Sequence, residues 1–335
     1  MTGYRQRDKG MRASTSRRAV LTTAALVPVL AGAGAADARA AGTHAGRRQE
    51  LIESVPTTED DWRGVTEVMG VRGRLAGGTV YRVDLPRRDL RVVCQGIPLN
   101  DTMGVGSFFS FVQYADGCTT VMGDMGVLER ELQHVIDALN AHGIGQAAVH
   151  KHLLATEPAV WFLHVHGVSD DPRTLARGLR AALARTGTPT GTWRPEAVDI
   201  DLDTDGIDAA LCAEGAAEGD IYKIVFARRE TITDHGRVLP PMTGATTALS
   251  FQPVGGGQAA INGDFVMTAD EVQHVVKALR CGGIDIVSLH NHMLMDEPRL
   301  FYLHFWAVDD AVKLARTLRN AVDATNMTPA SGVAG

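Results

Sequence analysis

Leu289-His290-Asn291-His292-Met293 has a counterpart 140 residues earlier, Val149-His150-Lys151-His152-Leu153. Each stretch is followed by a Glu-Pro turn, at Glu157 and at Glu297, and then by an apolar segment that carries a further histidine. Features that recur at one constant offset indicate an internal duplication. The duplicated unit contains a β-hairpin that bears histidines.

Both copies show the same order of periodic segments. A short helix is followed by several antiparallel strands, a middle helix, the histidine hairpin and a C-terminal helix. Two local signals support this order: Thr268 with Glu271 forms a capping box before the middle helix of the second copy, and Asp171-Pro172 is typical of a helix start. We predict an α+β fold of two tandem homologous repeats, each an antiparallel sheet with a middle and a C-terminal helix.

The repeat pattern also divides the chain. We expect a signal peptide at residues 1–40 and a polar segment at 41–59. Repeat 1 then covers 60–185, a linker rich in Gly, Thr and Pro covers 186–200, and repeat 2 covers 201–330.

The leader has the features of an export signal. Ser16-Arg17-Arg18 precedes an alanine-rich apolar run, and Ala38-Arg39-Ala40 matches a small-x-small cleavage site. The paired arginines favour twin-arginine export, which carries folded proteins and agrees with a bound metal, while Val20 in the place of the usual Phe leaves general secretion open. We expect a protein of the cell envelope or the extracellular space, with no transmembrane helix after leader removal and no lipid anchor.

The charge of the chain argues against a nucleic-acid partner. Without the leader's seven basic and two acidic residues, the formal net charge falls from −6 to −11. No basic stripe with interleaved aromatic residues provides an electrostatic footprint for phosphates.

The four cysteines allow up to two disulfides in three pairings, and buried free thiols are the alternative. They are Cys94, Cys118, Cys212 and Cys281.

The histidines of the two hairpins are candidate metal ligands. Side chains alternate faces along a strand, and opposed residues of a hairpin stand about 5 Å apart at Cβ, so several imidazoles can reach one ion at about 2.0–2.1 Å. We predict a divalent metal, with zinc as the first choice for imidazole and carboxylate ligands. Structural, hydrogen-bonded histidines copied by the duplication are the alternative. The predicted ligands are His150, His152, His164, His166, His290, His292 and His304.

Further residues are weaker candidates for the same chemistry. Glu131 with His134, and Glu271 with His274, place a carboxylate and an imidazole on one helical face. By contrast, the aspartates of Gly123-Asp124 and Gly263-Asp264 are expected to cap turns at strand ends rather than to bind metal.

Three functional classes stay open. The first is an exported metal-binding protein. The second is a metal-dependent hydrolase of the cell envelope, in which Glu157 or Glu297 serves as the general base for a metal-bound water. The third is a non-metal module that binds a cell-wall or protein ligand through Trp161, Tyr302 and Trp306.

The sequence resembles the LppY/LpqO family of bacterial envelope proteins, built from a domain of unknown function, number 1259. The resemblance rests on Tyr81-Arg82-Val83, on the Arg-Arg-acid segments at 87–89 and 228–230, on the two Gly-Asp pairs and on the histidine motifs. It covers residues 60–330 and implies an exported protein without an established activity. Relatives look like lipoproteins, whereas this chain lacks the cysteine that would carry a lipid.

Overall fold

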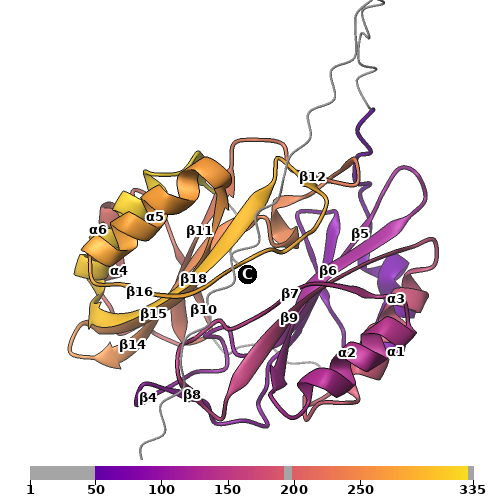
Figure 1. Ribbon diagram of the computed structural model, residues 1–335, viewed down its shortest axis with the longest axis horizontal. Helices are drawn as coiled ribbons and strands as arrows, with labels where there is room; N and C mark the ends of the chain where they lie inside the picture. Colours follow the sequence, from indigo (N-terminus) through magenta and orange to yellow (C-terminus); the bar gives the residue numbers. More distant parts are fainter. Residues whose placement is uncertain (1–49, 192–197, 331–335) are drawn as a thin grey trace, which may run out of the picture. The chain divides into compact units, whose positions relative to one another are not determined.

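Each repeat forms one large antiparallel sheet and one three-stranded sheet in the computed structural model, which describes residues 50–191 and 198–330 (Figure 1). The strand order of the large sheet is β1-β2-β5-β6-β9-β7 in repeat 1 and β10-β11-β14-β15-β18-β16 in repeat 2, where β19 also pairs with β11. The three-stranded sheets have the orders β4-β3-β8 and β13-β12-β17. This confirms the predicted α+β class with two tandem repeats. The expected signal peptide lies outside the described residues.

The elements of repeat 1 are η1 (Glu59–Trp62), α1 (Arg63–Met69), β1 (Arg74–Ala76), β2 (Val80–Leu85), β3 (Val93–Cys94), β4 (Ile97–Pro98), β5 (Ser107–Gln113), β6 (Thr119–Leu128), α2 (Leu132–Ala141), β7 (Gly145–His150), β8 (Thr156–Glu157), β9 (Val160–Ser169) and α3 (Pro172–Leu183). Those of repeat 2 are α4 (Thr204–Leu211), β10 (Ala216–Glu218), β11 (Ile221–Arg228), β12 (Thr233–Asp234), β13 (Arg237–Val238), η2 (Pro241–Thr243), β14 (Thr246–Gly255), β15 (Gln258–Thr268), α5 (Ala269–Cys281), β16 (Asp285–His290), β17 (Asp296–Glu297), β18 (Leu300–Asp310), α6 (Ala311–Val322) and β19 (Met327–Pro329).

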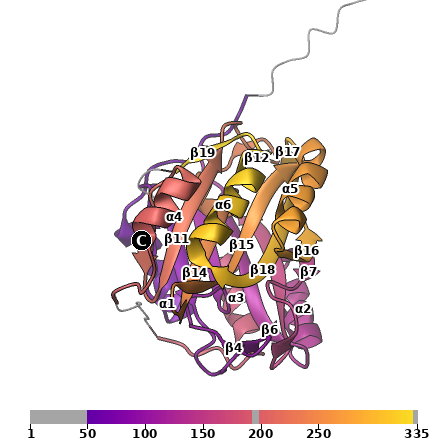
Figure 2. The same cartoon turned by 90° about the vertical axis from the view of Figure 1, so that its left-hand side faces the viewer.

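The helices of each repeat cover one face of its sheet, and the other faces of the two sheets lie toward each other (Figures 1 and 2). Alternation along β9 explains this arrangement, since Leu163 and Val165 join the core beneath the helices while His164 points to the opposite face. On β18, Leu303 and Phe305 do the same in repeat 2. The faces that meet are therefore the ones that carry the histidines.

The two repeats are also joined by direct hydrogen bonds. Gln252 accepts from the Asn100 backbone N–H at 2.9 Å and donates to the Pro98 carbonyl at 2.9 Å. The Ser110 hydroxyl donates to the Met242 carbonyl at 3.2 Å. Within residues 49–335 the repeats form one contact unit. None of the helices in the described ranges has the length and apolar content to span a bilayer.

An arginine in each repeat ties the sheet to the middle helix. Arg228 donates to both oxygens of Glu230, at 2.9 and 2.8 Å, and to Glu271 at 2.6 Å, and its side chain is 1% exposed. Arg87 makes the equivalent bonds to Asp89 and Glu131. Glu271 also accepts the Thr268 backbone N–H at 2.8 Å, which confirms the predicted capping box. We call these two networks the arginine clasps.

Two sequence expectations about strand ends are wrong. Asp124 and Asp264 do not cap turns, because β6 and β15 run on through them to Leu128 and Thr268. His152 and the equivalent His292 do not lie on the hairpin strands, because β7 and β16 end two residues earlier. All four cysteines are free thiols, and only Cys94 is buried.

The clasp of repeat 2 predicts an acid-sensitive contribution to stability. Its hydrogen bonds from Arg228 hold the pKa of Glu230 down, from 4.5 to about 2. A carboxylate with a lowered folded-state pKa contributes stability that is complete above pH 4.5 and is lost as the pH falls toward 2. Glu230→Gln should lower the free energy of unfolding at pH 7 by roughly 2 kcal/mol and flatten its pH dependence between these limits. Denaturant titrations across this range measure both effects, with the exposed Glu129→Gln as the control; parallel curves for the two variants would contradict the prediction.

Candidate metal centre

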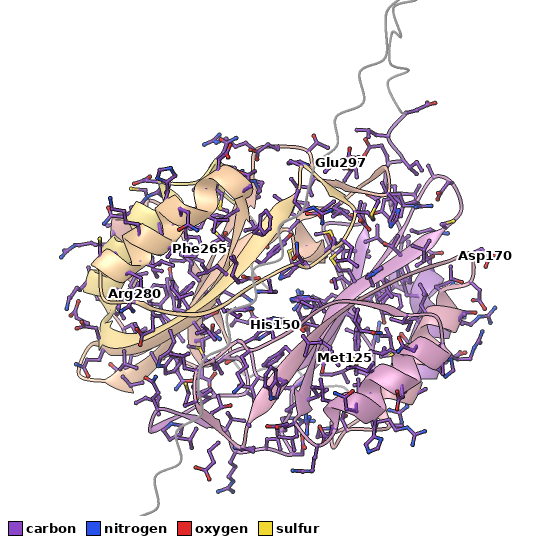
Figure 3. All side chains as sticks on the ribbon, in the orientation of Figure 1. Met125, His150, Asp170, Phe265, Arg280 and Glu297 are labelled. Carbon is purple, nitrogen blue, oxygen red and sulfur yellow. The ribbon has the colours of Figure 1, made fainter. Side chains whose placement is uncertain are left out.

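Six histidines and two aspartates meet where the two sheets face each other. His150, at the end of β7, and His290, at the end of β16, stack with ring centroids 3.8 Å apart. Figure 3 shows His150 between the two repeats. Its stacking partner His290 stands 140 residues later in the chain. The cluster consists of Asp124, His150, His152 and His164 from repeat 1 and Asp264, His290, His292 and His304 from repeat 2.

The cluster has two equivalent halves, which we call the His152 lobe and the His292 lobe. In the His152 lobe, Nε2 of His152 lies 2.6 Å from Oδ2 of Asp124, and its ring centroid lies 4.1 Å from that of His304. In the His292 lobe, Nε2 of His292 lies 2.9 Å from Oδ2 of Asp264, and its ring lies 3.8 Å from that of His164. Each lobe therefore takes one histidine from the opposite repeat.

Strand register brings the aspartates to the histidines. Asp124 on β6 is paired with His164 on β9, and Asp264 on β15 is paired with His304 on β18. The glycine before each aspartate permits this close sheet packing, since a Cβ at Gly263 would lie 2.1 Å from the Ala248 carbonyl oxygen. Sequence reasoning missed both aspartates as cluster members. Their Gly-Asp pairs recur at the same 140-residue offset as the histidines, and that offset was the signal that could have found them.

Backbone carbonyls orient three of the imidazoles. Nδ1 of His152 lies 3.1 Å from the Gly104 carbonyl oxygen, Nδ1 of His292 lies 2.8 Å from that of Gly244, and Nδ1 of His304 lies 2.7 Å from that of Gly263. A carbonyl oxygen only accepts, so each Nδ1 carries the proton and each neutral ring presents the lone pair of Nε2. This is the arrangement in which a second contact orients a metal-ligating histidine.

The ring nitrogens that face the interior have no hydrogen-bond partner. They include both nitrogens of His150 and His290 and Nε2 of His164, His292 and His304. All six histidines are at most 9% exposed. An unpaired buried polar group costs about 1–3 kcal/mol, so a ligand that bonds to these nitrogens would stabilise the folded protein.

Three sets of donor atoms are close enough to share an ion. Each set has its ligand atoms within 4.8 Å of one another, and two of the three sets combine residues of both repeats. The sets are Asp124 with His150, His152 and His164; His150 with His290 and His304; and His164 with His290 and His292. The buried histidine groups can therefore hold a metal ion.

Burial keeps five of the cluster histidines neutral. It lowers the pKa of His164, His292 and His304 from 6.5 to about 3, and it lowers the pKa of His150 and His290 well below 6.5. Neutral imidazole is the form that binds metal, because the protonated ring has no lone pair to donate.

The remaining predicted ligands lie away from the cluster. His166 is half-buried and stands two residues after His164 on β9. His134 and His274 are exposed on α2 and α5. Glu131 and Glu271 belong to the arginine clasps.

The predicted general bases and the aromatic residues are also placed elsewhere. Glu157 and Glu297 are exposed on the short strands β8 and β17, and Figure 3 shows Glu297 well away from His150. Tyr302 and Trp306 are buried at 0% and 1% exposure, so neither ring is presented to a surface ligand. Trp161 is half-buried on β9, with Nζ of Lys151 5.0 Å from its ring centroid.

The fold and the site together define a tandem α+β protein with a buried histidine and aspartate cluster between its repeats. A family model described as Domain of Unknown Function (DUF1259) matches residues 63–185 and 205–324. The chain belongs to this family and contains two copies of its domain. A comparison with curated proteins gave no match.

Solved structures give only a distant likeness. A double-ringed trimeric shell protein from the RMM microcompartment is 15% identical, with 62% of this chain and 82% of that chain covered and a TM-score of 0.18. EtuB from Clostridium kluyveri is 10% identical, with 77% and 94% covered and a TM-score of 0.19. At these TM-scores the likeness supports no argument about fold or function.

Neutral buried histidines predict a specific pH dependence for the metal-free protein. Each folded-state pKa of about 3 lies below the ordinary value of 6.5, so the unfolded chain binds more protons between these values. The free energy of unfolding should therefore be highest above pH 6.5 and decrease as the pH falls toward 3. Urea titrations of chelator-treated protein measure this decrease. A free energy of unfolding that is constant from pH 7 to about 5 would contradict the prediction, because the histidines of the unfolded chain bind protons in that interval.

Proposed function

We propose that this protein is an exported, divalent metal-binding protein of the cell envelope, with zinc as the first candidate and with the inter-repeat cluster as its site. The observation that carries the proposal is the contact between His292 and Asp264. Nε2 of His292 lies 2.9 Å from Oδ2 of Asp264, yet Nδ1 of the same ring is already hydrogen bonded to the Gly244 carbonyl, and burial lowers the pKa of His292 to about 3, so the ring is neutral. A neutral imidazole has one proton, so its Nε2 lone pair faces a carboxylate lone pair.

Two lone pairs at this distance repel each other unless a proton or a metal cation lies between them. Two atoms bound to one tetrahedral ion at about 2.1 Å stand about 3.4 Å apart, so the contacts of 2.6 and 2.9 Å would open slightly when an ion binds, whereas the 3.7 Å between Nε2 of His164 and Oδ2 of Asp124 is already close to this spacing. The same contact is present in both lobes. Neither His152 Nε2 nor His292 Nε2 makes a hydrogen bond of acceptable geometry.

The charge of the cluster points in the same direction. Among the described residues, histidines and no lysine or arginine contact the carboxylates of Asp124 and Asp264, and a buried charge without a partner is strongly unfavourable. A divalent cation compensates both carboxylates. Imidazole and carboxylate suit Zn²⁺, and Fe, Mn and Ni fit the same ligands.

The placement of the predicted general bases favours metal binding over hydrolysis. Glu157 and Glu297 are exposed outside the cluster, so a hydrolase would lack both of the bases that the sequence indicated. The paired arginines and the cleavage pattern of the leader support the export part of the proposal.

Removal of the two central histidines should strongly weaken metal binding. His150 and His290 each belong to two of the donor sets, so a His150→Ala/His290→Ala variant should bind zinc about 100-fold or more weakly. Elemental analysis of the exported protein and competition with a chelator of known affinity measure this loss. The matched control is His134→Ala/His274→Ala, which also removes two histidines but from exposed helix positions. Wild-type protein that is free of metal and takes up none would refute the proposal.

The aspartates separate a metal site from a structural cluster. In Asp124→Asn/Asp264→Asn the side chains keep their size, while two buried carboxylates are removed. A metal site predicts weaker zinc binding together with unchanged or higher stability of the metal-free protein, because buried unpaired charge is lost. Structural histidine-aspartate ion pairs predict the reverse, a loss of about 3–5 kcal/mol in the free energy of unfolding. Denaturant titration of the metal-free variant distinguishes the two.

A further inference from the structure

The two lobes of the cluster have the same ligands but different surroundings. Beyond His304 on β18 the next residue on the same face is Trp306, and beyond His164 on β9 it is His166. These two residues occupy equivalent positions of the two repeats. The duplication therefore places an indole beside the His152 lobe and an imidazole beside the His292 lobe.

The surroundings of the His152 lobe are apolar, although the side chain of His152 itself is 11% exposed. Trp306 is 1% exposed and belongs to an apolar cluster that includes Met103, Val105 and Phe162 of repeat 1. Cys94, the one thiol in that cluster, is 0% exposed, and burial raises its pKa to about 11, so it stays a neutral thiol. The carboxylate of this lobe, Asp124, is 1% exposed.

The surroundings of the His292 lobe contain histidine and aspartate side chains, the residue types that bind metal, with burial that increases toward the cluster. His235 is exposed, Asp234 and His166 are half-buried, and His164 is buried in the cluster. Asp234 and His166 occupy the positions that Cys94 and Trp306 hold, each in the other repeat. Cys94 and Trp306 belong to one buried cluster, so the repeated fold brings Asp234 and His166 near one another. The carboxylate of this lobe, Asp264, is 14% exposed, compared with 1% for Asp124.

Two further pairs of equivalent positions in the repeats show the same difference between the two lobes. Asp234 stands where repeat 1 has Cys94, and His235 stands where repeat 1 has Gln95. The backbone is the same in both places, since Gln95 and His235 have φ values of 48° and 50°. The backbone conformation is therefore the same at these two positions of both repeats. The side chains differ: repeat 1 has a thiol and an amide, whereas repeat 2 has a carboxylate and an imidazole, which can bind metal.

We propose that metal ions enter and leave the cluster through the His292 lobe, past Asp234 and His166, while Trp306 seals the His152 lobe. This inference rests on the proposed metal-binding function. His166 is then an exchange residue rather than a permanent ligand, which explains why it lies outside all three donor sets. The room for its ring comes from Gly145, where a Cβ would lie 2.7 Å from Nε2 of His166.

The test exchanges the two side chains. The His166→Trp variant places a tryptophan beside the His292 lobe, as Trp306 stands beside the His152 lobe. The Trp306→His variant places a histidine beside the His152 lobe. The full exported chain is loaded with Zn²⁺ and mixed with excess chelator, and the release of zinc is followed with time. His166→Trp should bind the same amount of zinc as wild type and release it about tenfold more slowly, a difference of about 1.4 kcal/mol in the barrier.

Trp306→His is the matched control and should release zinc at least as fast as wild type. Equal release rates for His166→Trp and wild type, or slow release from both variants, would overturn the proposed route. Where His166→Trp does not fold, Asp234→Asn tests the same route with a side chain of equal size. It should slow zinc uptake about threefold at low ionic strength, since it removes a charge that attracts the cation, and an unchanged uptake rate would also overturn the route. A wild-type protein that binds no zinc at equilibrium refutes the metal site itself, before any rate is compared.

Discussion

The structure depends on the burial of two polar sheet faces against each other. Each repeat covers one face of its sheet with helices, and the opposite face presents imidazoles and a carboxylate at its centre. These groups lose their water when the faces meet, and the ring nitrogens that point inward find no protein partner. Because unpaired buried groups are unfavourable, a metal ion bound at this interface would also stabilise the fold.

The duplication shows which parts of the repeat are the same in both copies. The arginine clasps are present in both, with Asp89 and Glu230 as equivalent partners of the arginine. A fully buried guanidinium that lost its hydrogen bonds would be strongly unfavourable, which is a physical reason for both copies to contain the clasp. The two ends of the cluster differ, with Trp306 at one and His166 at the other, although the backbone there is equivalent in the two repeats.

Local signals in the sequence were reliable where the interaction itself is local. The capping box of Thr268 and Glu271 and the helix start at Asp171-Pro172 are formed as expected, because both connect residues within one turn of a helix. Asp124 and Asp264 were misread for the same reason. A Gly-Asp pair is typical of a turn when only its neighbours are considered, whereas here the strands extend through it and pair with β9 and β18. His166 was predicted as a ligand since alternation gives its face, although it does not give its distance from the centre.

The sequence by itself determined the duplication, the order of helices and strands, and the residue types on the faces that carry the histidines. These follow from periodicity and from a constant offset, which are properties of the chain alone. Only the tertiary structure decided that the two hairpins form one cluster instead of two separate sites, with His150 stacked on His290. That contact joins residues 140 positions apart, and it arises because each sheet can bury its polar face only against the other copy.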